Sequence, residues 1–598
     1  MIYIRLAALG VAALMTLTAC GKSEDAVEKA VVAAVSESGN SLFAYVPADT
    51  PYLVGNLQPP PDEVIDTFLQ RFQPILDAVQ TELHKARQSI EAESGDGSQT
   101  PDEKRHNDMG IQLMHAVLQE LDGKLNRPGL ESMGFDLQSH KVIYGMGAFP
   151  VIRLGLSDAA ALRGSIMRVL SNAGISAPEL NHQGVSYWRL IDEEDDQEPA
   201  GLYVSVLDDH LAMSVFPPSA EAELLPAFLG VELPKESNAA ARLAELNAEH
   251  GYTAFGSGIL DLDRLLDEFI TPGTVLARTL EASGEFDPAS MTPECTTEIR
   301  SIVSNTPRMT MGVTELTSAA IGIQYRIETA AALAAQLSGL VAEIPAADTR
   351  SERILEFSFG MRFGAVRDFL REKAAAIMEA PYQCEHLQDI NQSATEAFTQ
   401  LNQPMPPFVN NFRGLRLSLN EIMMTDSIPE NARGMAAMHV DQPEMFVGMA
   451  QMFLPDLSEL SLVPGEPPVQ LPASMIPVPG IIAFAALSQD AIGLSLGEGE
   501  QAGLLDYLDE KPGPSGTFLS TSYDMAAYLD YTQKMSAQIQ DSDSDADDID
   551  PAHAAHYQSF MHISESAQEA FKAFADRSQA SLRFTPEGFV ADSRMTFK

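Results

Sequence analysis

The feature of the sequence that most constrains its fold is a set of segments that occurs twice in the same order. The stretches 154–170 and 438–454 both predict a short strand, a polar break and an amphipathic helix, with Gly164 opposite Gly448. One matched pair of stretches can arise by chance, but an ordered series rarely does. Such a series is typical of a chain built from two similar parts.

Three further pairs of stretches match in the same order along the chain. In each pair a predicted strand leads into an apolar-faced helix, or two alternating strands flank a polar turn. Asp261 and Asp524 match each other where a strand meets a helix, so both are predicted helix N-caps. The pairs are 211–229 with 492–508, 253–267 with 516–530, and 309–327 with 580–597.

The matched segments predict two α+β halves, 41–345 and 350–598, connected around the sequence EIPAADTRSE. Within each half, runs of strand, hairpin and helix favour an antiparallel sheet covered by helices over a doubly wound parallel sheet. A chain of 598 residues is also too long for one ordinary hydrophobic core and suits two or more domains. The sequence therefore predicts two internally duplicated halves, each with its own covered sheet.

The N-terminus carries a short apolar run that ends on a cysteine. Arg5 precedes about a dozen apolar residues at 6–17, fewer than the roughly 20 that a membrane-spanning helix needs. The run closes on the sequence LTAC, which resembles the signal of bacterial lipoproteins, where a diacylglycerol is attached to the cysteine thiol before cleavage. The resemblance implies a signal peptide at 1–19 and acyl chains on Cys20 that anchor the protein to a membrane.

The residues after Cys20 bear on the location of the protein. Gly21 and Lys22 follow the cysteine, and the lack of an aspartate beside it resembles lipoproteins that are sent to the outer membrane. We therefore expect the segment 20–40 to be a lipid-anchored tether and the protein to face the periplasm. The alternative is an ordinary secretory signal that contains a cysteine.

The charge of the chain limits its partners. A net charge of −46 and a pI near 4.4 create a field that repels phosphate backbones and anionic lipid surfaces. Nucleic acid is thus excluded as a partner. The acidity favours a well-solvated surface in a salty compartment, and recruitment of cations or basic partners is the second interpretation.

The remaining cysteines form a pair. Of three cysteines, Cys295 and Cys384 are left once Cys20 is assigned to the anchor. In an oxidising compartment an even pair predicts a disulfide, and two separate buried thiols are the alternative. Because Cys295 falls in the first predicted half and Cys384 in the second, the bond is expected to join the halves.

Two loops have the outline of ligand-binding motifs. The sequence GEGEQAG at 497–503 follows a strand and opens a helix, as a phosphate-binding loop would, but its two glutamates would repel a phosphate. A tight turn is predicted there instead. The acidic stretch 541–550 begins like a calcium loop, yet Ala546 and Ala552 stand where that loop needs Gly and Glu. Loose Ca²⁺ association remains an open alternative to a solvated loop.

Other metal-binding patterns are weaker. His553, His556 and His562 lack the spacing of a catalytic zinc site, which favours a solvated helix. The methionines between 435 and 452 could bind copper(I), but an adaptable apolar face for packing or a partner is the favoured interpretation. Met438 and Met445 are expected in the core, and Met449 and Met452 are expected to be exposed. We predict no cofactor, no metal site and no catalytic residue.

The opening of the mature chain, FAYVPADTPYLVGNLQPPPDEV, resembles uncharacterised bacterial envelope lipoproteins of unknown function. The resemblance implies a location and an architecture, because its motifs are structural. We expect a non-enzymatic lipoprotein that binds an envelope protein or a small ligand through its sheet faces or a cleft between the halves. A hydrolase or metal-dependent enzyme with a site between the halves, and a carrier of hydrophobic envelope cargo, are the alternatives.

Overall fold

The structure, a computed structural model, describes residues 42–93, 112–113, 116–191, 201–284, 290–349, 353–425, 428–453, 457, 460–476, 480–542 and 567–598. The predicted signal peptide, the tether with Cys20, the histidines at 553, 556 and 562, and most of the acidic stretch 541–550 lie outside these residues. Within the described part of the chain, no helix combines the length and the apolar character that a membrane span requires.

The predicted α+β fold class is confirmed, since helices and antiparallel strands make up two compact units. Unit 1 consists of the described residues within Met1–Met291, Arg308–Ile323 and Asp548–Phe574. Unit 2 consists of those within Thr292–Pro307, Gln324–Asp547 and Ala575–Lys598. Each unit therefore draws segments from both predicted halves.

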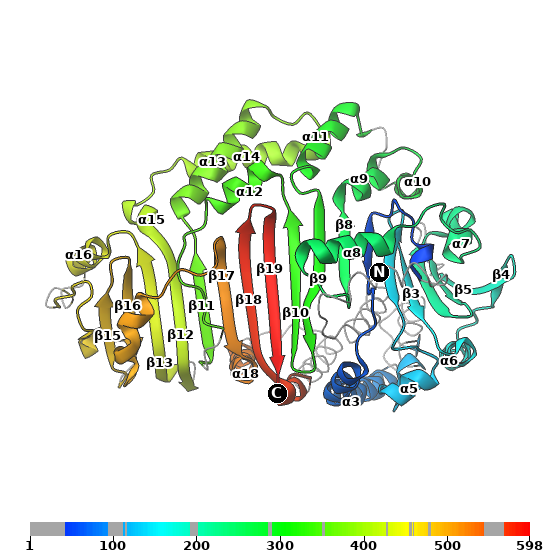
Figure 1. The fold of residues 1–598 in the computed structure, drawn as a ribbon, viewed down its shortest axis with the longest axis horizontal. Helices are drawn as coiled ribbons and strands as arrows, with labels where there is room; N and C mark the ends of the chain where they lie inside the picture. Colours follow the sequence, from blue (N-terminus) through cyan, green and yellow to red (C-terminus); the bar gives the residue numbers. More distant parts are fainter. Residues whose placement is uncertain are drawn as a thin grey trace. The chain divides into compact units, whose positions relative to one another are not determined.

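The sheet of unit 1 is antiparallel, in the order β9, β8, β1, β2, β3, β7, β6, β5, with β4 paired to β5 (Figure 1). Its strands are β1 (Tyr52–Gly55), β2 (Lys141–Met146), β3 (Phe149–Gly155), β4 (Leu180–His182), β5 (Val185–Ile191), β6 (Gly201–Val206), β7 (His210–Phe216), β8 (Ser257–Asp261) and β9 (Arg308–Thr317). Its helices are η1 (Leu42–Tyr45), α3 (Asp62–Glu93), α5 (Arg127–Ser132), α6 (Ala159–Asn172), η2 (Pro218–Ala220), α7 (Glu221–Phe228), α8 (Ala239–His250), α9 (Leu262–Ile270) and α10 (Val275–Ser283).

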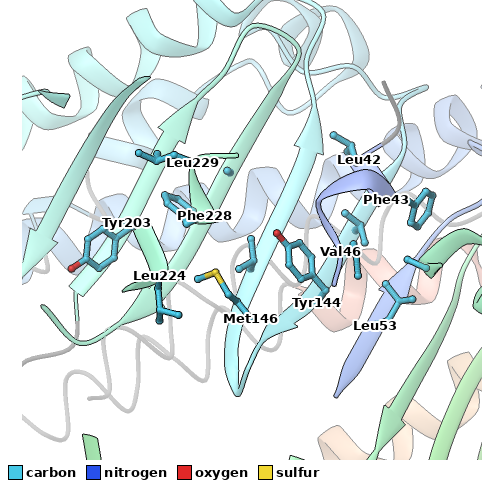
Figure 2. Packing of buried hydrophobic residues seen from close by; sticks show 14 of the residues in the cluster. Leu42, Phe43, Val46, Leu53, Tyr144, Met146, Tyr203, Leu224, Phe228 and Leu229 are labelled. Carbon is cyan, nitrogen blue, oxygen red and sulfur yellow. The ribbon is translucent and has the colours of Figure 1, made fainter. Parts of the chain in front are cut away.

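Helices cover both faces of this sheet. On one face, α7, α8 and η1 enclose a core in which Tyr144, Phe228 and Leu53 are buried (Figure 2). On the other face, α6 packs Leu162 and Leu170 against β6 and β7. The alternation of side chains along each strand thus supplies two apolar surfaces, and each receives a helix.

The sheet of unit 2 is antiparallel in the order β19, β18, β17, β11, β12, β13, β16, β15, β14. Its strands are β11 (Leu355–Gly360), β12 (Phe412–Thr425), β13 (Ile428–Val440), β14 (Val469–Gln470), β15 (Ala483–Leu487), β16 (Ala491–Leu496), β17 (Thr517–Asp524), β18 (Ala575–Thr585) and β19 (Gly588–Phe597), and β10 (Ala320–Glu328) crosses from unit 1 after Ile323. Its helices are α11 (Pro293–Val303), α12 (Ala331–Ser338), α13 (Phe363–Glu379), η4 (Glu385–Leu387), α14 (Gln388–Leu401), α15 (Pro407–Asn411), α16 (Pro443–Phe453), η6 (Ala473–Met475), η7 (Glu500–Gly503), α17 (Leu504–Leu508) and α18 (Met525–Ser542).

The two sheets follow one order of strand pairing. The series β9, β8, β1, β2, β3, β7, β6, β5 of unit 1 has the same succession along the chain as β18, β17, β11, β12, β13, β16, β15, β14 of unit 2. The matched sequence stretches fall on corresponding elements, such as β3 with α6 and β13 with α16. Both predicted N-caps are confirmed: the carboxylate of Asp261 accepts a hydrogen bond from Arg264 N at 3.1 Å, and that of Asp524 from Ala527 N at 2.8 Å.

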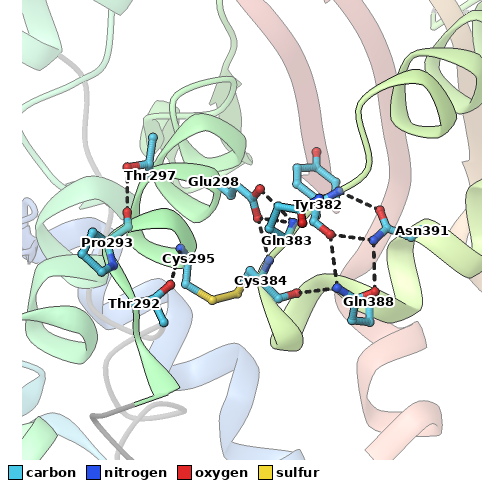
Figure 3. The surroundings of a disulfide bond; sticks show 10 residues. All are labelled: Thr292, Pro293, Cys295, Thr297, Glu298, Tyr382, Gln383, Cys384, Gln388 and Asn391. Atoms are coloured by element: carbon cyan, nitrogen blue, oxygen red, sulfur yellow. Dashed lines mark hydrogen bonds between the residues drawn. A yellow bond between two sulfur atoms is a disulfide. The ribbon is translucent and has the colours of Figure 1, made fainter.

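The predicted disulfide between Cys295 and Cys384 is present (Figure 3). Cys295 lies in the first turn of α11, where Thr292 caps the helix, and Cys384 lies in the loop between α13 and α14. The carboxylate of Glu298 accepts hydrogen bonds from the backbone N–H groups of Gln383 and Cys384, each at 2.9 Å. Because α11 belongs to unit 2, the bond lies within that unit, where it joins a segment of the first predicted half to a segment of the second.

Candidate functional site

A buried arginine organises the core of unit 1. Arg153 on β3 is 0% exposed, and its guanidinium donates to Phe228 O at 2.8 Å and to the Tyr144 hydroxyl at 3.2 Å. It also lies over the ring of Tyr45 at 4.0 Å. Phe228 is the last residue of α7, so the guanidinium satisfies a carbonyl that the helix itself leaves unpaired.

His210 completes this buried group. Because a guanidinium can only donate, the Nε2 atom of His210 accepts the 2.7 Å hydrogen bond from Arg153, and Nδ1 donates to Asp209 at 2.7 Å. Burial and the neighbouring positive charge of Arg153 lower the pKa of His210, so the imidazole is neutral at pH 7. Both ring nitrogens are occupied and the side chain is fully buried, so this Asp, His and Arg arrangement lacks the access that a catalytic base needs.

Unit 2 contains a second buried arginine that also donates a hydrogen bond to a carbonyl near the end of a helix. Arg416 on β12 donates to Tyr507 O at 2.7 Å and lies over the Tyr507 ring at 4.1 Å. Tyr507 belongs to the short helix α17, which corresponds to α7 in the order of elements. Arg416 also pairs with Glu510. In the order of strand pairing, β12 is the fourth strand of its series in unit 2 and β3 is the fifth strand of its series in unit 1.

The histidine near Arg416 predicts a measurable pH dependence. Burial, together with the charge of Arg416, lowers the pKa of His439 from 6.5 to about 4. As the pH falls, the unfolded chain therefore takes up a proton at His439 before the folded chain does. The contribution of neutral His439 to the stability of unit 2 is thus fully present above pH 6.5 and is lost as the pH falls towards 4. We expect urea denaturation to show a loss of about 2 kcal/mol from this group between pH 7.5 and 5.

The matched variants are His439→Gln and His386→Gln, since His386 is exposed in the same unit. The first should reduce the difference between pH 7.5 and pH 5 by that amount, and the second should leave it unchanged. An unaltered pH dependence in His439→Gln would contradict the assignment.

The glycine-rich stretch 497–503 forms the predicted tight turn. Gly497 and Gly499 both have a φ of +89°, and η7 follows directly. Glu500 is buried, and its carboxylate receives Arg353 and Arg433 at 3.2 Å each and the Asn420 amide at 2.6 Å. The basic groups at this turn are thus engaged by a carboxylate of the chain itself, which disfavours phosphate binding.

The sequence contains a G-x-S-x-G pattern at 493–497, which was not identified among the candidate motifs. Ser495 lies within β16, is 0% exposed, and its hydroxyl has no hydrogen-bond partner among the described residues. A catalytic serine of this pattern must stand exposed at a turn between a strand and a helix. Ser495 therefore does not provide a nucleophile. Among the described residues, no group of three or more His, Cys, Asp or Glu side chains could hold a metal ion.

The sheet of unit 2 has polar side chains on its covered face. Glu356, Ser358, Ser418 and Ser522 are all buried. Ser418 donates to Glu356 at 2.5 Å, Ser358 donates to Pro345 O at 2.6 Å, and Arg577 donates to Ser522 at 2.9 Å. Because successive side chains of a strand point to opposite faces of the sheet, the large apolar side chains of these strands lie on the other face.

That opposite surface, called here the apolar face of unit 2, is continuous across four strands. Direct cross-strand pairs join Phe359 to Leu415, Leu415 to Met438, and Met438 to Ile492. Leu415 and Leu494 are 45% and 42% exposed, values far above those of core leucines. The face consists of Leu355, Phe357 and Phe359 of β11, Leu415, Leu417 and Leu419 of β12, Ala436 and Met438 of β13, and Ile492, Leu494 and Leu496 of β16.

One residue of the methionine-rich stretch, Met438, belongs to this face. Met435 is buried under α17, whereas Met445 is 37% exposed and Met452 is 79% exposed on α16. The predicted exposure of Met452 is confirmed, and the predicted core position of Met445 is wrong. Met438, also expected in the core, and Met449, expected to be exposed, are both half-buried. Exposed methionines and leucines are typical of adaptable apolar binding surfaces.

The geometry defines an α+β chain whose most distinctive surface is the apolar face of unit 2. Comparison with protein-family models, with curated proteins and with solved structures finds no match. The function must therefore be argued from the residues of this chain alone.

Proposed function

We propose that this chain is a lipid-anchored, non-enzymatic protein of the cell envelope that binds an apolar partner through the apolar face of unit 2. The observation that carries the proposal is the exposure of Leu415 and Leu494 in the middle of a continuous apolar surface. The LTAC signal supports attachment through Cys20, most plainly to the periplasmic side of the outer membrane. The buried side chains of Arg153, Arg416 and His210, all paired within the chain, support a binding role over a hydrolytic one.

The same observation favours one alternative, a carrier of hydrophobic envelope cargo. An exposed aliphatic surface accepts an acyl chain as well as a protein side chain. The two functions differ in what remains bound after purification, a lipid or a protein. We also infer that the common order of strand pairing in the two units descends from a duplicated half.

The anchor is tested by replacing Cys20 with serine. We expect Cys20→Ser to move the protein from the membrane fraction into the soluble periplasmic fraction, because the acyl chains supply the attachment. Fractionation with high-salt and alkaline washes measures this, and Lys22→Ser serves as a control that keeps the acylated residue. Recovery of Cys20→Ser in washed membranes would contradict the anchor.

The binding role is tested by capture from crosslinked envelopes. We expect Leu415→Asp with Leu494→Asp to lose the captured partner, because each new carboxylate would be buried in the complex without a partner. The matched control is Leu370→Asp on α13, which is 45% exposed in the same unit and outside the apolar face. Equal capture by the double variant and the wild type would overturn the proposed function.

A further inference from the structure

The face of unit 1 that corresponds to the apolar face of unit 2 is covered by a helix. Leu154 and Leu211 form a cross-strand pair there, at the position that Met438 and Ile492 hold in unit 2. α6 lies on this surface with Leu162 and Leu170 buried. A helix is thus the element that this arrangement of strands accepts in the same molecule.

The helix that covers unit 1 is amphipathic and basic. α6 has the sequence AAALRGSIMRVLSN, with two arginines and no acidic residue. Arg163 donates to Val206 O at 2.9 Å and lies 5.5 Å from the Trp188 ring centre, and Arg168 pairs with Glu120 at 2.6 Å. The basic side chains of α6 therefore have polar or aromatic partners, while its leucines are buried against the strands.

The corresponding helix of unit 2 starts differently. Asp158 precedes α6 with a φ of −146° and caps it, whereas Gln442 precedes α16 with a φ of +60°. A positive φ at a residue other than glycine turns the chain in another direction. α16 carries the acidic residue Glu444 and leaves Met452 exposed, and Leu415 and Leu494 of the apolar face also remain exposed.

Acidic side chains border the apolar face at one end. Val440 N donates to Asp490 O at 2.9 Å, which places the ends of β13 and β16 side by side. Asp490 and Glu444 are exposed there, and Asp441, half exposed, pairs with Arg413 at 2.6 Å. Together with the net charge of −46, these carboxylates favour a basic partner and disfavour an anionic one.

We propose that the apolar face of unit 2 binds an amphipathic helix of a partner protein that carries basic residues, as α6 covers unit 1. This inference rests on the proposed function and names the class of its partner. The leucines of the face hold the apolar side of the helix, and the carboxylates of Asp490 and Glu444 attract its basic side chains.

The test uses a synthetic peptide with the α6 sequence, blocked at both ends and carrying a fluorescent dye. Fluorescence anisotropy with the full chain should show saturable binding with a dissociation constant on the order of 10–100 μM, because a short free helix must be ordered on binding. Leu415→Asp with Leu494→Asp should weaken binding about tenfold or more, and Leu370→Asp should not change it. A peptide with Arg163→Glu and Arg168→Glu should also bind about tenfold or more weakly.

A second measurement does not depend on how the variants fold. A photoreactive form of the α6 peptide should label β12 and β16 of the wild-type protein, as mapped by mass spectrometry, and a peptide with Leu162→Asp and Leu170→Asp should not compete. Absence of saturable binding up to about 1 mM, or labelling elsewhere, would overturn the proposal. Preferential binding of phosphatidylcholine vesicles through Leu415 and Leu494 would overturn it in favour of a lipid.

The two levels of the proposal fail in different ways. If the peptide does not bind but capture from envelopes still depends on Leu415 and Leu494, the helix proposal is wrong and the binding role stands. If capture does not depend on these leucines, the proposed function itself is wrong.

Discussion

Replacement of Arg153 by methionine is expected to destabilise unit 1 by about 3–5 kcal/mol. The change leaves Phe228 O, the Tyr144 hydroxyl and the Nε2 atom of His210 without their donor at a site that is 0% exposed. Each buried acceptor that loses its hydrogen bond costs about 1–3 kcal/mol, and methionine offers packing but no donor. The loss of stability should therefore be several times larger than the loss caused by an ordinary substitution at the surface.

The single tryptophan makes this effect measurable in unit 1. Trp188 on β5 is the only tryptophan of the chain and is buried, so its fluorescence reports the unfolding of this unit in urea. The matched control is Arg278→Met, because Arg278 is exposed and pairs with Glu223 at the surface. That control should change the free energy of unfolding by less than about 1 kcal/mol. A shift of the same small size in Arg153→Met would contradict the structural role of the guanidinium.

Removal of the disulfide by Cys295→Ser with Cys384→Ser is expected to destabilise unit 2 by up to about 4 kcal/mol. The bond closes a loop with a sequence separation of 89, and closure of a long loop restricts the unfolded chain strongly. The loss should concentrate in α11 and in the loop between α13 and α14, because Glu298 joins these elements through the Gln383 and Cys384 backbone.

Hydrogen exchange measured by mass spectrometry should show faster exchange in these elements than in the strands of unit 1. A reductant provides an internal control, since it should bring the wild type to the level of the double variant and leave the double variant unchanged. Detection of two free thiols in the wild-type protein under non-reducing conditions would contradict the bond.

Much of the fold could be predicted because it depends on local patterns. The matched stretches marked corresponding strands and helices, and Asp261 and Asp524 were recognisable as N-caps because capping needs an acceptor at one fixed position. The turn at 497–503 was predictable from its glycines and glutamates. Partners that are distant in the sequence could not be predicted. Phe228 lies 75 residues from Arg153, and no local pattern connects the two residues.

The candidate site was only partly accessible to sequence reasoning. The alternation in β11 and β12 indicates strands, but it does not tell which face a helix covers, and in unit 2 the serines face inward and the leucines outward. The cysteine pair was predicted correctly, whereas its place within unit 2 depends on how α11 packs. Met445 was assigned to the core because its helix resembles α6, yet α16 starts with a different backbone turn at Gln442.

The two buried arginines donate to carbonyls in the last turn of corresponding helices, Phe228 O of α7 and Tyr507 O of α17, from neighbouring strand positions. In the paired series, Arg153 stands where unit 2 has Ala437, and Arg416 stands where unit 1 has Val142. Adjacent strands are about 4.8 Å apart, a gap that the long arginine side chain can span. A residue-by-residue comparison of the two series of strands finds a different residue at both positions. In each unit, however, an arginine donates a hydrogen bond at the end of the corresponding helix. Two units with one order of strand pairing therefore form the same kind of interaction with arginines at different positions.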